Sequence, residues 1–227
     1  MTILHDILAK LEAAGDPADA LAVARYHKAS RRVLGVKVPA LEAMARALRG
    51  GLPLGERLAL ADGLWQTDVH EARVLAAKLL DQARIRPDDA GAWALIQSWL
   101  PDFDAWAIAD HACIAGQKRL LADPRRLDAV AAWASAGPLW TRRAALVITL
   151  PWAKFKQPTE AQRAAREQVL GWAAGAVADP AWFMQKAVAW WLRELSRPDP
   201  DRARAFVGAH GAQMKPFARR EALRLLD

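Results

Sequence analysis

Hydrophobic residues recur every three or four positions along most of the chain, which is the spacing of one face of an α-helix. Alternating runs rich in Val and Ile, and Asn-Gly turns, are missing from the sequence, although strands and hairpins usually show them. We therefore predict an all-α protein. The predicted helices cover residues 2–14, 17–27, 39–49, 54–65, 68–84, 88–98, 103–121, 124–135, 138–150, 159–177, 180–197, 199–208 and 215–226.

Residues that start or stop helices stand at many of these boundaries. Thr67-Asp68, Asp123-Pro124 and Asp179-Pro180 each offer an N-cap side chain or a proline for the first turn. Gly50-Gly51 and Pro198 mark helix ends. Short helices joined by short turns predict antiparallel helix pairs, so we searched the sequence for an internal repeat.

A weak repeat is present, in which an ionisable residue precedes an alanine on every second predicted helix from 68–84 onward. Its copies are Glu71-Ala72, His111-Ala112, Arg143-Ala144, Lys186-Ala187 and Glu221-Ala222, at spacings of 40, 32, 43 and 35 residues. Such irregular spacing is typical of degenerate HEAT-like repeats rather than of stricter helical repeats. We predict an α-solenoid of HEAT-like repeats with a concave basic groove, forming a single domain over residues 1–227.

The composition points to a polyanionic partner. The 227 residues are 53% hydrophobic, which is enough for a core, and 32 Lys and Arg against 25 Asp and Glu leave a net charge of +7. Arginine suits bidentate contacts to phosphate, so nucleic acid is the first hypothesis. The alternative is that an Ala- and Arg-rich composition only reflects a coding sequence of high GC content.

The single cysteine, Cys113, excludes a disulfide framework and a site built from several thiolates. The first residues lack the basic start and apolar core of a secretory signal. The most apolar stretch, 144–153, is interrupted by Pro151 and is shorter than the roughly 18 residues of a membrane helix. We expect a cytoplasmic protein without membrane association.

Asp110 and Arg143 stand on otherwise apolar helix faces when each segment is wound at about 100° per residue. The apolar neighbours are Phe103, Trp106, Cys113 and Ile114 for Asp110, and Trp140, Val147 and Leu150 for Arg143. An unpaired buried charge costs several kcal/mol, so each needs a partner or a ligand. Taken alone, these faces favour a packed Trp106 and a buried ion pair; a binding site for a ligand is the alternative.

The segment 182–197 shows a different face. Lys186, Trp190, Arg193 and Arg197 follow helical spacing apart from the apolar stripe. One interpretation is a phosphate-contacting stripe with an aromatic platform for a sugar or base. The other is a surface Trp stacked under its own cations. The remaining tryptophans at helical spacing with Leu and Ala are interpreted as core or surface packing: Trp65, Trp93, Trp99, Trp133, Trp172 and Trp182.

Residues 25–39 combine a lone tyrosine, Tyr26, with a dense set of cations that includes Lys28 and Lys37. Such a turn can clamp backbone phosphates while the tyrosine stacks, or it can be a solvated basic turn. No dinucleotide-binding, phosphate-loop, zinc-protease or nucleophile-elbow motif occurs, and the five histidines are dispersed. We predict no metal site and no cofactor.

Six motifs in order along the chain resemble those of the HEAT-like-repeat DNA alkylation-repair glycosylases, the AlkD family. They are Tyr26-His27-Lys28 with residues 34–39, Leu64-Trp65 with residues 71–73, residues 106–110, residues 139–145, residues 185–194, and residues 219–222. The resemblance spans nearly the whole chain. It implies a C-shaped stack of helical pairs that grips duplex DNA and excises N3- and N7-alkylated purines, such as 3-methyladenine and 7-methylguanine, without drawing the base into a pocket.

The same resemblance implies roles for individual residues. Asp110 would be the catalytic carboxylate, Trp106 and Trp190 would flank the lesion's deoxyribose, and Arg143 would contact the adjacent backbone. The further predicted DNA contacts are Tyr26, Lys28, Lys37, Arg142, Lys186 and Arg193. The expected partner is double-stranded DNA with alkylated purines, bound by a monomer.

The sequence departs from the family pattern near its N-terminal end. His27 stands where many relatives have Met, and residues 29–33 lack an aromatic residue that often precedes the Leu-Gly pair. Some members of the wider superfamily bind branched or altered DNA without excising a base. A non-catalytic binder of damaged or branched DNA is therefore the alternative function, and a protein-binding HEAT-like scaffold is a third.

Overall fold

The fold is seen in a computed structural model that describes residues 2–27 and 31–226. The chain forms two compact units, Met1–Ala122 (unit 1) and Asp123–Asp227 (unit 2), and each is described by itself. The prediction of an all-α protein is confirmed. Among the described residues, β-type pairing is limited to an isolated bridge between Arg32 and Val69. The prediction of one domain over the whole chain stays a prediction.

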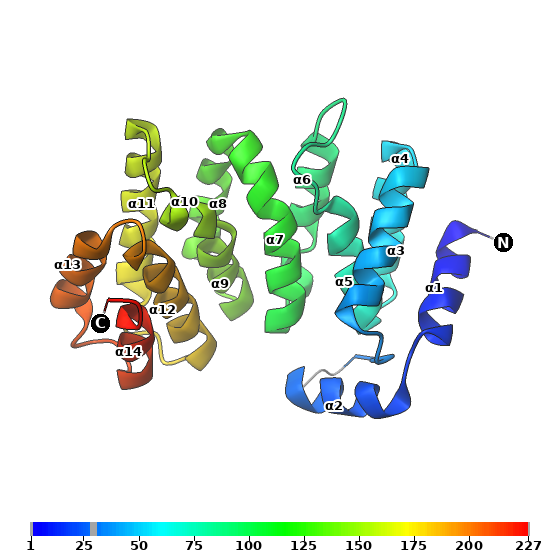
Figure 1. Cartoon of the computed structure of the whole chain (residues 1–227), viewed down its shortest axis with the longest axis horizontal. Coiled ribbons are helices and arrows are strands. Elements are labelled where there is room, and N and C mark those ends of the chain that lie inside the picture. Colours follow the sequence, from blue (N-terminus) through cyan, green and yellow to red (C-terminus); the bar gives the residue numbers. More distant parts are fainter. Residues whose placement is uncertain (1, 28–30, 227) are drawn as a thin grey trace. The chain divides into compact units, whose positions relative to one another are not determined.

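Unit 1 consists of helices packed in two layers (Figure 1). Its helices are α1 (Ile3–Ala13), α2 (Pro17–His27), α3 (Val38–Gly51), α4 (Leu54–Gln66), α5 (His70–Leu80), α6 (Ala90–Ser98), the 3₁₀ turn η1 (Leu100–Asp102) and α7 (Trp106–Ala122). Helix α4 contacts α1 and α6 in one layer, whereas α5 contacts α3 and α7 in the other. All residues of α5 are buried, so this helix is the centre of the unit.

Unit 2 repeats this arrangement. Its helices are the 3₁₀ turn η2 (Pro124–Arg126), α8 (Leu127–Ala134), α9 (Leu139–Ile148), α10 (Leu150–Lys154), α11 (Glu160–Ala176), α12 (Trp182–Ser196), α13 (Pro200–His210) and α14 (Pro216–Leu223). Helix α12 lies between α9 and α14 in one layer, and α8, α11 and α13 pack against that layer. The five ionisable-Ala pairs of the sequence repeat fall on α5, α7, α9, α12 and α14.

Polar contacts between helices follow the period of the repeat. Trp65 Nε1 donates to Asp102 Oδ2 at 2.9 Å, 37 positions away, and Lys78 Nζ donates to Glu42 Oε2 at 2.8 Å, 36 positions away. Arg142 Nη2 donates to Asp179 Oδ2 at 3.0 Å, again across 37 positions. Elements about one repeat apart in the sequence are therefore joined by polar contacts, as expected of a repeat in which neighbours bury one another's faces.

Several predicted helix boundaries differ from the structure. The segment 138–150 ends as α9 at Ile148, and a separate short helix, α10, follows because Thr149 leaves helical geometry and Pro151 has no N–H to continue the ladder. The segment 103–121 begins as a helix only at Trp106. Thr67-Asp68 does not cap α5, because Asp68 has a positive φ of 55° and Val69 is the N-cap.

The core contains several of the tryptophans expected to pack. Trp65 and Trp99 are fully buried and stack at 4.3 Å between ring centroids, and Trp93 and Trp133 are also buried. Removing such a ring typically costs about 3–5 kcal/mol. In the described part of the chain, no helix has the length and apolar character needed to cross a membrane.

Candidate nucleic-acid interface

Helix α7 brings two predicted catalytic residues of unit 1 together. It begins at Trp106, and Asp110 follows four residues later, so the two side chains share one helix face. The small residues Ala107 and Ala109 lie beside them in the buried part of the helix. Asp110 is only 9% exposed and Trp106 is half-buried. A buried carboxylate thus lies one helical turn from a partly open indole.

Two aromatic side chains of α2 contact Trp106, and one of α5 packs against them. The ring centroid of His27 lies 4.8 Å from that of Trp106, and the exposed Tyr26 meets Trp106 edge-on at 5.8 Å. His70 stacks on His27 at 5.1 Å. The structure therefore places the predicted Tyr26 beside Trp106. Lys28, also a predicted DNA contact, lies outside the described residues.

Three of the dispersed histidines gather in unit 1. Burial lowers the pKa of His70 to about 4 and that of His111 to about 4, and burial also lowers the pKa of His27. The nearby charge of Lys78 further lowers the pKa of His111, and the neighbouring His70 and His27 lower it as well. At neutral pH the imidazoles of His70 and His111 are therefore uncharged. Sequence spacing gave no sign of this cluster.

The loop after α2 is anchored to α5 by Glu71. Its carboxylate accepts the backbone N–H of Leu34 at 2.9 Å and of Gly35 at 2.8 Å. Gly35 has a φ of +82°, and a Cβ there would lie 2.1 Å from the carbonyl oxygen of Asp16, so only glycine fits. These contacts explain why the Leu-Gly pair and Glu71 occur together, and they position the end of α2 near Trp106.

Cations of the same loop are engaged in different ways. The side chain of Arg31 is 5% exposed and pairs with Asp68 at 3.0 Å and with Asp104. The predicted contact Lys37 is an exposed residue, with Nζ 3.4 Å from Asp19 Oδ2. Arg31 thus holds the loop in place, whereas Lys37 can exchange its exposed partner for a phosphate, because such surface pairs contribute little.

In unit 2, Arg142 and Arg143 leave α9 toward different partners. Arg143 is 5% exposed, and its Nη1 donates to the carbonyl of Phe183 at 2.8 Å. Arg142 pairs with Asp179 and donates to the carbonyl of Ala136 at 3.2 Å. Both guanidinium groups therefore connect α9 with neighbouring segments of unit 2. Their predicted contact with DNA stays a prediction.

Trp190 is held by an acid one turn further along α12. Its Nε1 donates to Glu194 Oε1 at 3.2 Å. Glu194 also lies 3.3 Å from Arg193 and 3.8 Å from Lys154, and Arg193 pairs with Glu221 of α14. The predicted Arg193 is thus part of an ion-pair network, while the predicted Lys186 lies 5.1 Å over the ring of Trp182.

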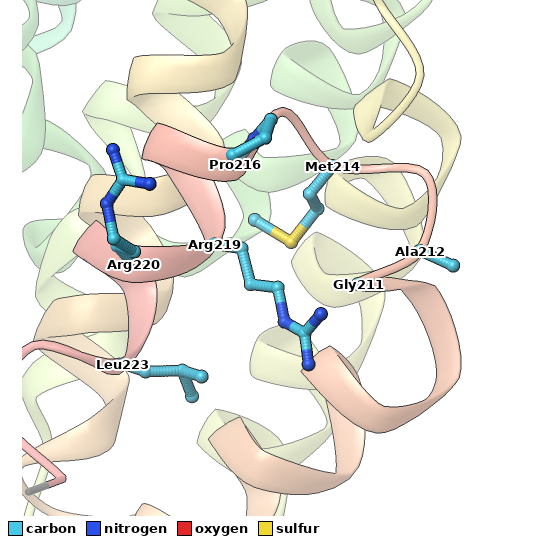
Figure 2. A pocket seen from close by; sticks show the side chains of 7 residues that line it. All are labelled: Gly211, Ala212, Met214, Pro216, Arg219, Arg220 and Leu223. Atoms are coloured by element: carbon cyan, nitrogen blue, oxygen red, sulfur yellow. The ribbon is translucent and has the colours of Figure 1, made fainter.

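A shallow cavity opens between α13 and α14 in unit 2 (Figure 2), with a volume of about 470 Å³. Arg219 and Arg220 leave α14 in different directions there, Arg219 beside Met214 (Figure 2). The cavity is lined by Gly211, Ala212, Met214, Pro216, Arg219, Arg220 and Leu223. None of the predicted site residues lines it. Among the described residues, no three His, Cys, Asp or Glu side chains are grouped so that they could hold a metal ion.

Comparison with known proteins identifies a family. The family model described as DNA alkylation repair enzyme matches residues 7–226. A structure from Enterococcus faecalis, described as a predicted DNA alkylation repair enzyme, is 19% identical with a TM-score of 0.78, over 93% of this chain and 96% of that one. A comparison with curated proteins finds no match.

Two further structures share the fold. AlkD2 from Streptococcus mutans is 18% identical with a TM-score of 0.64, over 84% of this chain and 91% of that chain. A protein described as related to the HEAT-like repeat DNA glycosylases, with affinity for branched DNA structures, is 14% identical with a TM-score of 0.68, over 91% and 83% of the two chains. The predicted HEAT-like repeat fold is thereby confirmed.

Proposed function

This chain belongs to the DNA alkylation repair enzyme family, and we propose that it is a DNA glycosylase for N3- and N7-alkylated purines. In this proposal the protein hydrolyses the N-glycosidic bond of lesions such as 3-methyladenine and 7-methylguanine in duplex DNA, without flipping the base into a pocket. No metal ion or organic cofactor takes part.

The observation that carries the proposal is the buried carboxylate of Asp110 beside Trp106 on α7. An alkylated purine is already cationic and leaves readily, so the enzyme mainly has to stabilise the positive charge that develops on the deoxyribose. A fixed carboxylate does this best where water is excluded, because the local dielectric is low. The same carboxylate can align the attacking water.

The surroundings of Asp110 support this role. A protein that only binds phosphates gains nothing from a buried anion, because that anion repels the DNA backbone. The indole of Trp106 offers a ring face that favours a cation.

In unit 2 we propose Trp190, oriented by Glu194, as a ring that contacts a sugar of bound DNA, and Arg143 as a contact to a backbone phosphate. Arg142, Lys186 and Arg193 are proposed as further backbone contacts. Helices α9 and α12 begin without a side-chain hydrogen bond to their first turns, and we propose that phosphate oxygens accept from N–H groups there.

The test is incubation of the purified protein with methylated duplex DNA and chromatography of the released bases. The native protein is expected to release free 7-methylguanine or 3-methyladenine, and Asp110→Asn is expected to lose nearly all of this release, about 100-fold or more, while retaining DNA binding. Asp62→Asn, which neutralises an exposed carboxylate of α4, is the matched control and should keep the native rate. If the native protein releases none of the alkylated purines, the proposal is wrong.

A second candidate function has support from one relative. The structural likeness to a protein with affinity for branched DNA supports a function in DNA binding without base excision. This function predicts tight, salt-sensitive binding to junctions or abasic sites and no base product. The same incubation separates the two candidates, since only a glycosylase yields a free base.

A further inference from the structure

Four aromatic rings form a continuous row across the first turns of α9, α12 and α14. Trp140 lies 4.9 Å from Phe183 between ring centroids, and Phe183 meets Trp182 edge-on at 5.0 Å. Trp182 stacks with Phe217 at 5.7 Å, with 29° between the ring planes. Residues from three separate helices thus build one aromatic surface within unit 2.

Trp182 is unusually open for a tryptophan. It is 50% exposed, whereas Trp65, Trp99 and Trp191 are fully buried. The sequence interpretation placed it among core or surface packing residues, but its ring lies at the surface. Exposed large aromatic side chains that line up with others usually mark a binding surface.

A cation covers the same rings. Lys186 Nζ lies 5.1 Å from the ring centroid of Trp182 and 5.7 Å from that of Phe217. A cation–π contact at the surface is worth only about 0.5–1 kcal/mol, so it explains the position of the lysine but not the ordered aromatic row beneath it. A flexible lysine can leave the rings and pair with a phosphate when a base covers them.

The position of Phe217 is set by a buried amide. Gln185 is fully buried; its Oε1 accepts the backbone N–H of Lys215 at 3.2 Å, and its Nε2 donates to the carbonyl of Asp179 at 3.0 Å. These bonds fasten the start of α14 to the start of α12. The aromatic surface is therefore held in place before any ligand arrives, which lowers the entropy cost of binding.

We infer that Trp182 and Phe217 form a stacking platform for an unpaired nucleobase of bound DNA, with Lys186 pairing with the phosphate of that nucleotide. A base within a duplex cannot stack there, because both of its faces are covered by neighbouring base pairs. The occupant is therefore a base from a bulge, a flap or a site of disrupted pairing. Stacking of this kind tolerates any sequence. This inference rests on the DNA binding in the proposed function.

The test uses unmethylated duplexes that carry a single unpaired 2-aminopurine, and fully paired duplexes of the same sequence. The native protein is expected to bind the bulged duplex more tightly and to quench the fluorescent base by stacking. Trp182→Ala should weaken binding to the bulged duplex about ten-fold or more and remove the quenching, with little change for the paired duplex. Phe217→Ala should have a smaller effect in the same direction.

Two variants make the result specific. Trp182→Phe retains a ring and should restore most of the quenching. Trp172→Ala removes a half-buried tryptophan of α11 in the same unit and should leave the preference for the bulged duplex unchanged. Circular dichroism melting checks that each variant is folded. Equal losses on both duplexes in Trp182→Ala, or no loss, would overturn the inference.

Base release from methylated DNA, measured in parallel, separates this inference from the proposed function. If the native protein releases bases and Trp182→Ala behaves like the native protein on the bulged duplex, only the platform is wrong. If the native protein releases no base but its quenching depends on Trp182, only the glycosylase proposal is wrong. A native protein that binds neither duplex would overturn both.

Discussion

Helices α7 and α12 carry the same spacing of a tryptophan and an acid, yet the two acids have different surroundings. Trp106 precedes Asp110 by four residues in unit 1, and Trp190 precedes Glu194 by four in unit 2. Glu194 accepts a hydrogen bond from its own tryptophan and lies within ion-pair distance of Arg193 and Lys154.

In the proposed function the two acids have different roles, because Asp110 acts on the sugar and Glu194 positions Trp190. The charge of Glu194 is balanced by permanent cations, and its carboxylate fixes the indole of Trp190. Asp110 is buried on α7 one helical turn from Trp106, whose ring contacts His27 and Tyr26. Identical spacing along a helix therefore does not define a role; the side chains contributed by neighbouring helices do.

The largest expected effect is on base release. Asp110→Asn should slow single-turnover release about 100-fold or more, because it removes the charge that stabilises the developing cation. Glu194→Gln should slow it only a few-fold, because the amide oxygen still accepts the Trp190 N–H. Quench-flow assays on methylated duplex measure both rates. Similar losses in the two variants would contradict the distinction between the two acids.

The second largest expected effect is on the free energy of unfolding at acidic pH. It should arise from two histidines of unit 1. The pKa values of His70 and His111 are about 4 in the folded protein, against 6.5 ordinarily, so the unfolded chain binds their protons first. Stability is therefore complete above about pH 6.5 and falls as the pH is lowered toward 4. Between pH 7 and pH 5 the loss is on the order of 2 kcal/mol per histidine.

Urea denaturation at several pH values measures this loss. His70→Gln and His111→Gln should each flatten the dependence between pH 7 and pH 5. The pKa values of Glu42 and Glu167 are lowered by hydrogen bonds from Lys78 and Arg202, so these carboxylates lose their contribution only at lower pH. An unchanged slope in both histidine variants would show that other groups govern acid sensitivity.

The smallest expected effect is on the salt dependence of DNA binding in variants of unit 2. Lys186→Ala should weaken binding to paired duplex a few-fold and lower the salt dependence by about one phosphate contact. Arg193→Ala should leave the salt dependence nearly unchanged, because Arg193 already pairs with Glu221 and Glu194. Fluorescence anisotropy titrations at several salt concentrations measure both slopes. A larger change for Arg193→Ala would show that its ion pairs open when DNA binds.

Local patterns in the sequence were sufficient for the helical class, for most helix positions and for the unusual charged positions on α7, α9 and α12. The period of 3.6 residues and the cost of burying a charge are properties of single helices, so Asp110 and Arg143 could be singled out as unusual without tertiary information. The family motifs then suggested their roles.

The tertiary structure alone decided which side chains meet. His27 stacks on His70, Glu71 holds Leu34 and Gly35, and Trp182 stacks on Phe217, each across roughly one repeat of sequence. Such contacts depend on how successive helix pairs pack. Because the spacing of the repeat is irregular, the sequence does not show which residues of neighbouring helix pairs lie opposite one another. Helical periodicity therefore specified the faces of this protein, while packing between helices decided which faces became an acid site, an ion-pair network or an open aromatic surface.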